Sequence, residues 1–236
     1  MKNRIIEATI LAVGFCFIGL MLFMGIESFK NKNRVVSVKG LAEMEVPANK
    51  ITWPLMYKDL GDDLISLYNN INTKNKAIIA FLKINGIAEE EISVAAPEIL
   101  DLKAERYSNT IPEFRYNATS VITVTSNKVD KVRKLMSEQT ELLKQGIAIS
   151  GGDYRYNVNY EFTGLNEIKP GMIEEATRNA RLAAEKFAKD SNSKLGKIRD
   201  AYQGQFTITD RDSNTPYIKN VRSEERRVGK ECRSRW

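Results

Sequence analysis

The chain has 236 residues and a formal net charge of +6, with 36 basic and 30 acidic side chains, two cysteines and no histidine. The cysteines are Cys16 and Cys232, one toward each end, so the body between them has neither imidazole nor thiol groups. This excludes Ser-His-Asp and Cys-His catalysis, thiolate or imidazole metal sites and structural disulfides in the body.

The positive charge is concentrated toward the two ends of the chain. Residues 1–34 carry five basic and two acidic side chains, residues 223–236 carry five and three, and residues 35–222 are left with a net charge of +1. Nucleic-acid binding requires clustered positive charge that faces phosphates. We therefore expect no nucleic-acid partner.

An uncharged apolar segment of nineteen residues runs from Ala8 to Ile26. A helix rises ~1.5 Å per residue, so a segment of this length covers the ~30 Å hydrocarbon core of a bilayer. A buried core helix would normally show a polar stripe, and this segment has none. The pattern predicts that residues 5–26 contact the lipid bilayer.

The same segment could be a cleaved signal or a retained anchor. Lys2 and Arg4 form a basic leader, but the apolar run exceeds the ~7–15 residues of a signal core and no A-x-A site follows it. We expect a signal anchor and juxtamembrane link over residues 1–34; cleavage would instead give an exported soluble form. Basic residues flank both sides, so the positive-inside rule gives no orientation. The short N-terminal tail favours export of the body, which places a single-pass protein in the bacterial inner membrane with its body in the periplasm.

The first part of the body reads as two strands and a helix. Val35–Lys39 has β composition and is ended by Gly40, and Ile51–Lys58 alternates as a half-buried strand. Pro54 indicates an edge position or a bulge. Apolar residues then recur at helical spacing over Leu64–Ile84.

A long antiparallel hairpin and a second helix follow. Ile92–Tyr107 is extended, residues 108–112 supply a turn, and Phe114–Thr125 has the clearest strand composition in the chain. Ser126–Gly146 has the apolar stripe of a helix.

Tyr154–Phe162 alternates strictly, which predicts a strand with an aromatic row on one face. Such a row could bind a sugar or a base, but one face of a sheet under helices is the favoured interpretation. The row comprises Tyr154, Tyr156, Val158, Tyr160 and Phe162.

A third helix is expected from Pro170 to Asp190, followed by strands at Lys194–Ile198 and Tyr202–Ile208. The many alanines of this helix imply close approach to a sheet or another helix. Its predicted inward face comprises Ile173, Ala176, Thr177, Ala180, Ala183, Ala184, Phe187 and Ala188.

The composition of the sequence changes abruptly at Ser223. Tyr217–Arg222 reads as the start of a strand that is not completed, and residues 223–236 are highly charged without apolar periodicity. The segment resembles translated adapter sequence, and we interpret it as a non-native or disordered tail; a genuine basic arm is the alternative. The expected domains are therefore residues 1–34, 35–222 and 223–236.

No catalytic, cofactor-binding or metal-binding residue stands out. Asp210–Asn214 has acidic residues at calcium-loop spacing, but Thr215 and Val221 occupy the positions that need Gly and Glu, so we interpret it as a polar loop. Carboxylates could run acid–base chemistry without histidine. The acidic residues available for such a hydrolase are Asp59, Asp62, Asp63, Glu98, Asp101 and Glu105.

The order of these elements and several local motifs resemble the SIMPL-domain family, also called DUF541, which includes the YggE-like and outer-membrane-type periplasmic proteins. The matching residues are Val36–Gly40, Val46–Asn49, Phe81-Leu82, Asn85-Gly86-Ile87, Ile92-Ser93, the alanines of the third helix, and Lys194-Leu195-Gly196. Asn49 stands where members often have Asp. The resemblance implies an exported α+β domain in the cell envelope that forms ring-like oligomers, and it brings no catalytic residues.

These observations predict an α+β fold: antiparallel sheets packed by three main helices, with a long β-hairpin, preceded by one transmembrane or signal-anchor helix. We expect a membrane-anchored envelope protein, not an enzyme, that forms a homo-oligomer or binds a protein partner of unknown identity. Self-association would use sheet edges or the hairpin Ile92–Thr125. The alternatives are a periplasmic small-ligand-binding module that uses Tyr154, Tyr156 and Tyr160, and the carboxylate hydrolase.

Overall fold

The computed structural model describes the backbone of residues 2–31, 35–104, 112–150 and 154–232, and the side chains of residues 10–26, 35–104, 112–150 and 155–224. Its helices are α1 (Lys2–Asn31), α2 (Leu64–Ile84), η1 (Glu89–Glu91), α3 (Val129–Glu138), α4 (Thr140–Lys144), η2 (Tyr154–Tyr156) and α5 (Leu165–Asp190). Its strands are β1 (Val35–Pro47), β2 (Lys50–Gly61), β3 (Ile92–Val94), β4 (Glu98–Asp101), β5 (Tyr116–Ser126), β6 (Asn159–Glu161), β7 (Lys194–Asp210) and β8 (Ile218–Cys232).

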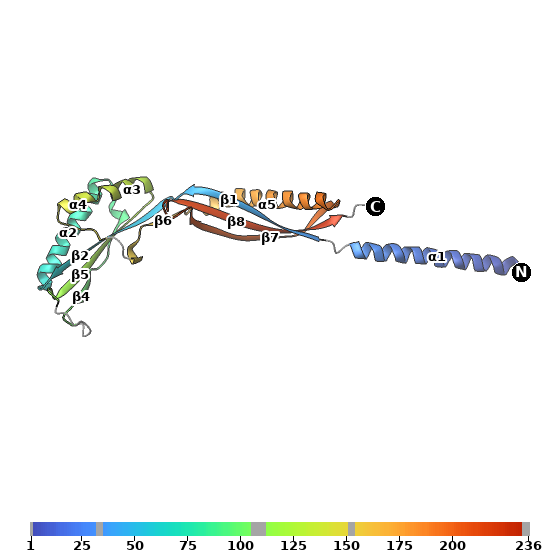
Figure 1. Cartoon of the computed structure of the whole chain (residues 1–236), viewed down its shortest axis with the longest axis horizontal. Coiled ribbons are helices and arrows are strands. Elements are labelled where there is room, and N and C mark those ends of the chain that lie inside the picture. The colour runs from blue at the N-terminus through green and yellow to red at the C-terminus, as the bar shows by residue number, and fades with distance from the viewer. Residues whose placement is uncertain (1, 32–34, 105–111, 151–153, 233–236) are drawn as a thin grey trace. The chain divides into compact units, whose positions relative to one another are not determined.

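The chain divides into two compact units, and the predicted α+β class with antiparallel sheets is confirmed (Figure 1). Unit 1 comprises Met1–Met44, Asn166–Ile208 and Val221–Trp236 and contains the three-stranded sheet β1-β8-β7. Unit 2 comprises Glu45–Leu165 and Thr209–Asn220 and contains the sheet β3-β5-β2-β6, with β4 also paired to β5.

The core of unit 2 forms between α2, α3 and one face of its sheet. Ile51, Trp53 and Leu55 of β2 alternate with less buried residues and point into this core, as the period-2 pattern predicts. The neighbouring strand β5 contributes Ile122 and Val124 to the same cluster. The opposite face of the sheet does not contribute to this core.

The ends of α2 follow the local sequence. Asp63 is the N-cap, and its carboxylate accepts a hydrogen bond from Ser66 N at 2.7 Å. After the C-cap Asn85, Gly86 has φ +78°, a conformation that favours glycine. The predicted helix over Ser126–Gly146 is instead two helices, α3 and α4, which meet at Gln139.

The long hairpin is present, but its first arm is broken. β3 and β4 both pair antiparallel with β5, and the register shifts by one residue between Ile92↔Val124 and Ile99↔Ala118. The extra residue interrupts the hydrogen-bond ladder between this arm and β5. It lies next to Pro97, which has no backbone N–H to donate. Residues 105–111, at the predicted end of this arm, lie outside the described residues.

The predicted strand over Tyr154–Phe162 is wrong, because only β6 is extended there and η2 precedes it. β6 pairs with β2 at Ile51↔Tyr160 and Thr52↔Asn159. Ser150 N donates to Met56 O at 2.7 Å, so the even-numbered residues of β2 direct their backbone groups to this edge. Pro54 has no N–H there, and the ladder ends.

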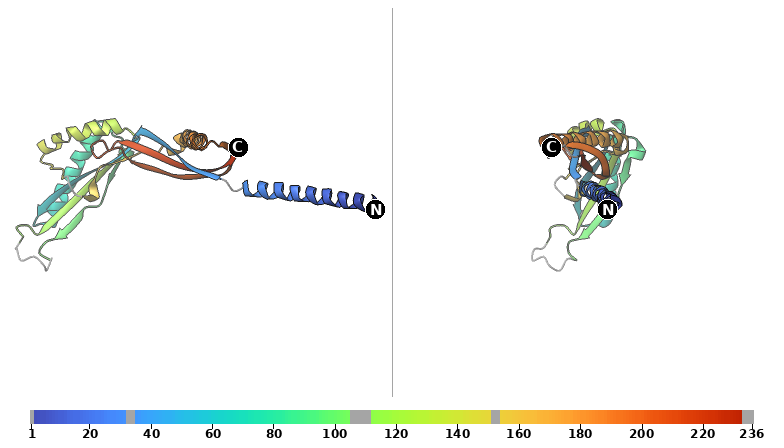
Figure 2. Two further views of the ribbon diagram at one scale, coloured as in Figure 1. Left: turned by 45° about the vertical axis from the view of Figure 1, so that its right-hand side comes forward. Right: turned by 90° about the vertical axis from the view of Figure 1, so that its right-hand side faces the viewer.

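In unit 1, α5 lies along one face of the β1-β8-β7 sheet (Figures 1 and 2). The helix begins at Leu165, five residues before the expected start, and Pro170 lies inside it. There it removes one backbone hydrogen bond without ending the helix.

Three strands of unit 1 are longer than predicted. β1 continues through Gly40 to Pro47, and β7 is one strand of 17 residues instead of two short ones. β8 runs from Ile218 through Cys232, so the prediction that this strand is not continued beyond Arg222 is wrong. The non-native origin of residues 223–236 stays a prediction.

At the N-terminus, α1 forms the expected helix, and its side chains over residues 10–26 are all exposed. Searched over the residues described here, the helices include none that is both long and apolar enough to span a membrane.

Candidate functional site

A groove of unit 1 lies between α5 and β7, because α5 lies over β1. Ala176, Ala180 and Ala184 line the buried stripe of α5, and Val38 of β1 packs in one cluster with Ala180 and Ala184. Beneath the helix, a Cβ on Gly40 would lie 1.8 Å from Ala176 O. Small side chains thus bring the helix backbone onto β1, the strand on the opposite edge from β7.

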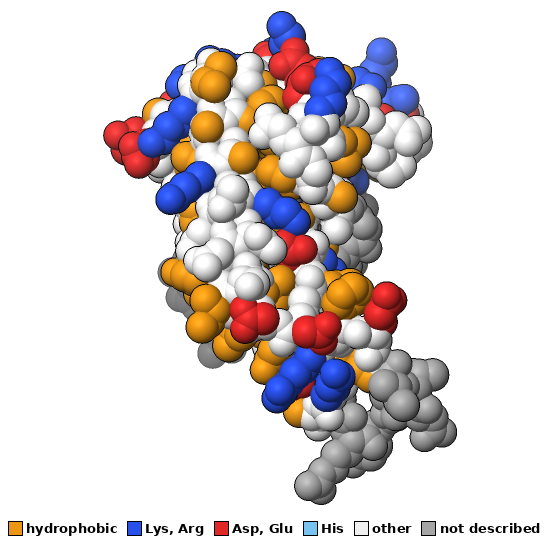
Figure 3. Space-filling view, turned by 90° about the vertical axis from the view of Figure 1, so that its left-hand side faces the viewer, with side chains coloured by type: hydrophobic (Ala, Val, Ile, Leu, Met, Phe, Trp, Pro, Cys, Tyr) orange, Lys and Arg blue, Asp and Glu red, His pale blue; other side chains and the backbone are white. Residues whose placement is uncertain are grey.

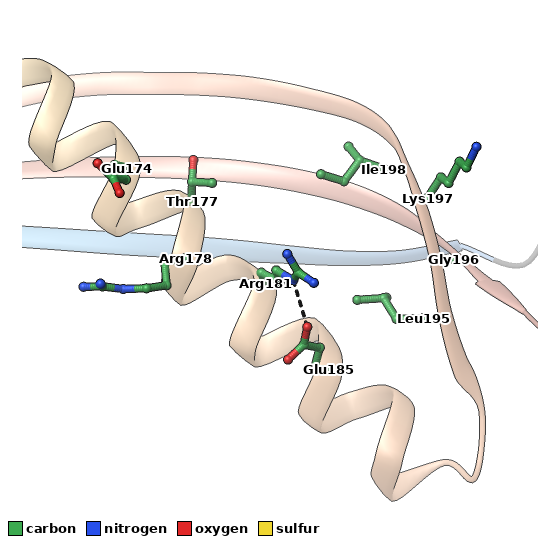
Figure 4. A pocket seen from close by; sticks show the side chains of 9 residues that line it. All are labelled: Glu174, Thr177, Arg178, Arg181, Glu185, Leu195, Gly196, Lys197 and Ile198. Carbon is green, nitrogen blue, oxygen red and sulfur yellow. Dashed lines mark hydrogen bonds and ion pairs between the residues drawn. The ribbon is translucent and has the colours of Figure 1, made fainter.

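The groove has an apolar floor and a charged rim (Figure 4). Its volume is about 570 Å³, within the range of small-molecule clefts. Leu195 and Ile198 point toward α5, whereas Lys197 points away. On the helix side the rim comprises Glu174, Thr177, Arg178, Arg181 and Glu185, with Arg181 Nε 2.8 Å from Glu185 Oε1.

Beside this groove, β7 is an uncovered edge strand. The strand order β1-β8-β7 leaves one side of β7 without a neighbouring strand among the described residues. Ile198 is 55% exposed and Tyr202 is 65% exposed. Sequence reasoning missed this surface, although the apolar residues at even positions of a largely polar strand were the signal that could have found it.

The predicted carboxylates serve separate structural interactions. Asp59 pairs with Lys74 at 2.8 Å, and Asp62 accepts a hydrogen bond from Arg115 N at 2.9 Å. The Arg115 guanidinium donates to Asp101 at 2.9 Å and lowers the pKa of that carboxyl. Hydrogen bonds from Ser66 lower the pKa of Asp63, the α2 N-cap.

The last two members of that set are placed differently. Glu98 lines a cleft on the open face of the unit 2 sheet. Glu105 lies outside the described residues. Within the described residues, no group of three or more His, Cys, Asp or Glu side chains could hold a metal ion.

The tyrosines of the predicted row do not share one surface. Tyr156 lines the same cleft as Glu98. Tyr160 instead packs against Tyr217, with ring centroids 6.3 Å apart, and the Arg133 guanidinium lies 3.6 Å from the Tyr217 ring centroid. Burial raises the pKa of Tyr160, and the charge of Arg133 partly opposes this shift. The side chain of Tyr154 lies outside the described set.

The polar loop at Asp210–Asn214 is closed by its own hydrogen bonds. Asp212 accepts from Asn214 N at 2.9 Å and from both Thr215 N and Thr215 Oγ1 at 2.8 Å. These contacts, first of all the Thr215 hydroxyl, lower the pKa of Asp212. The carboxylate therefore acts as a turn-forming group.

A buried polar cluster joins α2 to the sheet of unit 2. The Tyr57 hydroxyl lies 2.8 Å from Asn75 Oδ1 and 3.0 Å from Ile71 O, and Ser120 Oγ donates to Asn75 Oδ1 at 3.1 Å. Burial raises the pKa of Tyr57. Because Tyr57 and Ser120 are no more than 1% exposed, this cluster is structural.

Comparison with known proteins gives the family but no activity. The SIMPL family profile, described as a protein of unknown function (DUF541), matches residues 36–229. The match covers most of the chain, and the protein therefore belongs to the SIMPL family. No curated protein matches it. The family is not known as enzymatic.

Proposed function

We propose that the protein is a membrane-anchored component of the bacterial cell envelope whose folded body self-assembles or binds a protein partner, and that it is not an enzyme. Its place would be the inner membrane, with one span and the body in the periplasm, or the periplasm itself if the signal is cleaved. The uncovered β7 edge is the observation that carries the assembly.

The anchor is supported by the apolar segment Ala8–Ile26 and by its exposure. Phe15, Phe17 and Phe23 of α1 are each more than 60% exposed, although helices of soluble proteins bury such side chains. Exposed apolar surface all around a helix is stabilised by lipid.

Assembly is supported by the composition of the two outer strands of the unit 1 sheet. Residues 201–209 of β7 form an uncharged stretch without proline, and proteins normally protect such edges with charges, proline or cover. The other outer strand, β1, exposes Val35, Leu41 and Met44. Pairing between copies would satisfy both edges.

The charges along the groove favour a head-to-tail contact. Along α5 they run Glu174, Arg178, Arg181, Glu185. A two-fold axis at the middle of this stretch would set Arg178 opposite Arg181 of the second copy and Glu174 opposite Glu185, so like charges would meet. A contact from β7 of one copy to β1 of the next avoids this, and such contacts close into rings or extend as filaments.

Light scattering after gel filtration of the full chain in detergent tests the assembly. We expect a discrete oligomer, a lower mass for Tyr202→Lys because a charge protects the edge, and an unchanged mass for Tyr68→Lys. Tyr68 is a matched control because it is 53% exposed but lies in unit 2. A monomeric wild type at high concentration would contradict the proposal.

A second candidate function, small-ligand binding, is favoured by the cleft that Glu98 and Tyr156 share. Calorimetric titration of small polar ligands into the full chain tests it. The carboxylate hydrolase has no such support, because Asp59, Asp63 and Asp101 each serve a structural contact.

A further inference from the structure

The open face of the unit 2 sheet is not a plain solvent face, because η2 stands beside it. Met56 lies on this face yet is only 3% exposed. Between η2 on one side and β4 on the other, a cleft of about 360 Å³ remains, which fits a small ligand.

The floor of the cleft carries three threonine hydroxyl groups. Thr52 of β2 and Thr119 and Thr123 of β5 all line it and are half-buried. Among the described residues these three hydroxyls have no hydrogen-bond partner, whereas Ser120 on the core face of the same strand is bonded to Asn75. Each threonine hydroxyl can both donate and accept.

The walls add one charge of each sign and an aromatic ring. Glu98 stands on one wall and makes no ion pair or hydrogen bond within the described part of the chain. Arg155 and Tyr156 stand on the other, with the Arg155 guanidinium 5.6 Å from the Tyr156 ring centroid. The described lining residues therefore carry one charge of each sign, together with hydroxyls that donate and accept and an apolar ring face.

From this lining we infer that the cleft binds a small neutral polyhydroxylated ligand, a mono- or disaccharide. Sugar hydroxyls match groups that donate and accept, and the C–H face of a sugar packs on an aromatic ring. An anion would need an excess of positive charge, which Glu98 cancels. An apolar ligand would leave the threonine hydroxyls and the carboxylate unpaired. This inference rests on the small-ligand function proposed above and names its ligand class.

Calorimetric titration of the full chain, in a detergent without a sugar headgroup, tests the inference. The probes are glucose, N-acetylglucosamine, their disaccharides, and zwitterionic amino acids. We expect saturable binding of a saccharide, weakened about fivefold by Thr123→Val and about tenfold or more by Glu98→Gln. Thr125→Val is the matched control, because Thr125 lies on the same strand and face but outside the cleft, and it should leave binding unchanged.

The outcomes separate the ligand class from the function. Binding of amino acids but not saccharides overturns the sugar assignment and leaves the small-ligand function standing. Binding of neither overturns both. Saccharide binding that Thr123→Val and Thr125→Val weaken equally places the site elsewhere, and Thr123→Val preserves the β-branched shape, so the variant protein should still fold.

Discussion

At the scale of single residues, buried hydroxyls differ in whether they have a partner. Ser120 Oγ donates to Asn75 Oδ1 at 3.1 Å and Ser126 Oγ donates to Glu91 Oε1 at 2.7 Å. Ser223 is 1% exposed, and its Oγ has no hydrogen-bond partner within the described structure. A buried hydroxyl without a partner loses its water contacts and regains nothing.

We therefore expect Ser223→Ala to raise the free energy of unfolding by about 1 kcal/mol, and Ser120→Ala to lower it by about 1 kcal/mol. Both residues are fully buried strand positions, so each variant is the control of the other. Thermal unfolding followed by circular dichroism measures the two shifts. Equal destabilisation by both variants would show that the Ser223 hydroxyl has a partner.

Glu91 couples stability to pH. The Ala88 backbone N–H, then Ser126 and Lys128, bind the Glu91 carboxylate and lower its pKa from 4.5. Because the folded state favours the ionised form, Glu91 adds stability above pH 4.5, and this contribution is lost as the pH falls through the lowered pKa.

Glu91→Gln should therefore be less stable than the wild type at neutral pH, with a difference that shrinks below pH 4.5 and disappears in acid. Gln resembles the protonated Glu in shape, so the two proteins converge there. Urea unfolding at a series of pH values gives the comparison. The exposed neighbour Glu90 provides the control Glu90→Gln, and an unfolding difference for Glu91→Gln that does not vary with pH would exclude the linkage.

At the scale of elements, α5 packs closely on β1 because the facing residues have small side chains or none. The predicted close approach through alanines is confirmed by the stripe Ala176, Ala180, Ala184 and Ala188. The prediction that Phe187 lies on the same inward face is wrong, because its side chain is 61% exposed. Ala188 takes the buried position of this turn, and the adjacent Phe187, about 100° around the helix, faces solvent.

We expect Gly40→Ala to destabilise unit 1 by about 2 kcal/mol or more, because the added methyl group would overlap Ala176 O and force the helix away from β1. Gly171→Ala, on α5 with open space around its Cβ position, should be neutral or stabilise by about 0.5 kcal/mol. Thermal unfolding again separates them. Equal stability of the two variants would mean that α5 docks less closely than described.

At the scale of the whole molecule, the proposed membrane anchor α1 can be tested by placing charge in its apolar segment. An Arg at the centre of a membrane helix costs ~2.5–3.5 kcal/mol, so Phe17→Arg combined with Leu20→Arg should release much of the protein from membranes. Alkaline extraction of membrane fractions, followed by immunoblotting, measures this release. Phe17→Leu combined with Leu20→Phe preserves the apolar character and should stay in the pellet, and complete extraction of the wild type would contradict the anchor.

On the mixed face of the molecule drawn in Figure 3, acidic and basic side chains alternate without a large area of either sign. This distribution agrees with the near-neutral net charge of residues 35–222. That face shows no concentration of positive charge of the kind that contacts phosphates.

The sequence by itself determined the features that depend on residues close together in the chain. The uncharged run Ala8–Ile26, the cap Asp63, the stop at Asn85-Gly86 and the alternation of β2 all depend on local periodicity or capping. The order of such features was also enough to identify the family, because the family profile reads the same linear pattern.

Only the tertiary structure decided which surfaces are left open. The broken row Tyr154–Phe162 follows from Pro54 on a strand a hundred residues earlier, and the uncovered edge of β7 follows from the strand order β1-β8-β7. Glu98 and Tyr156, which line one cleft, come from segments that lie far apart in the sequence. Such juxtapositions depend on backbone pairing and close packing through space, which a period of two or 3.6 residues does not encode.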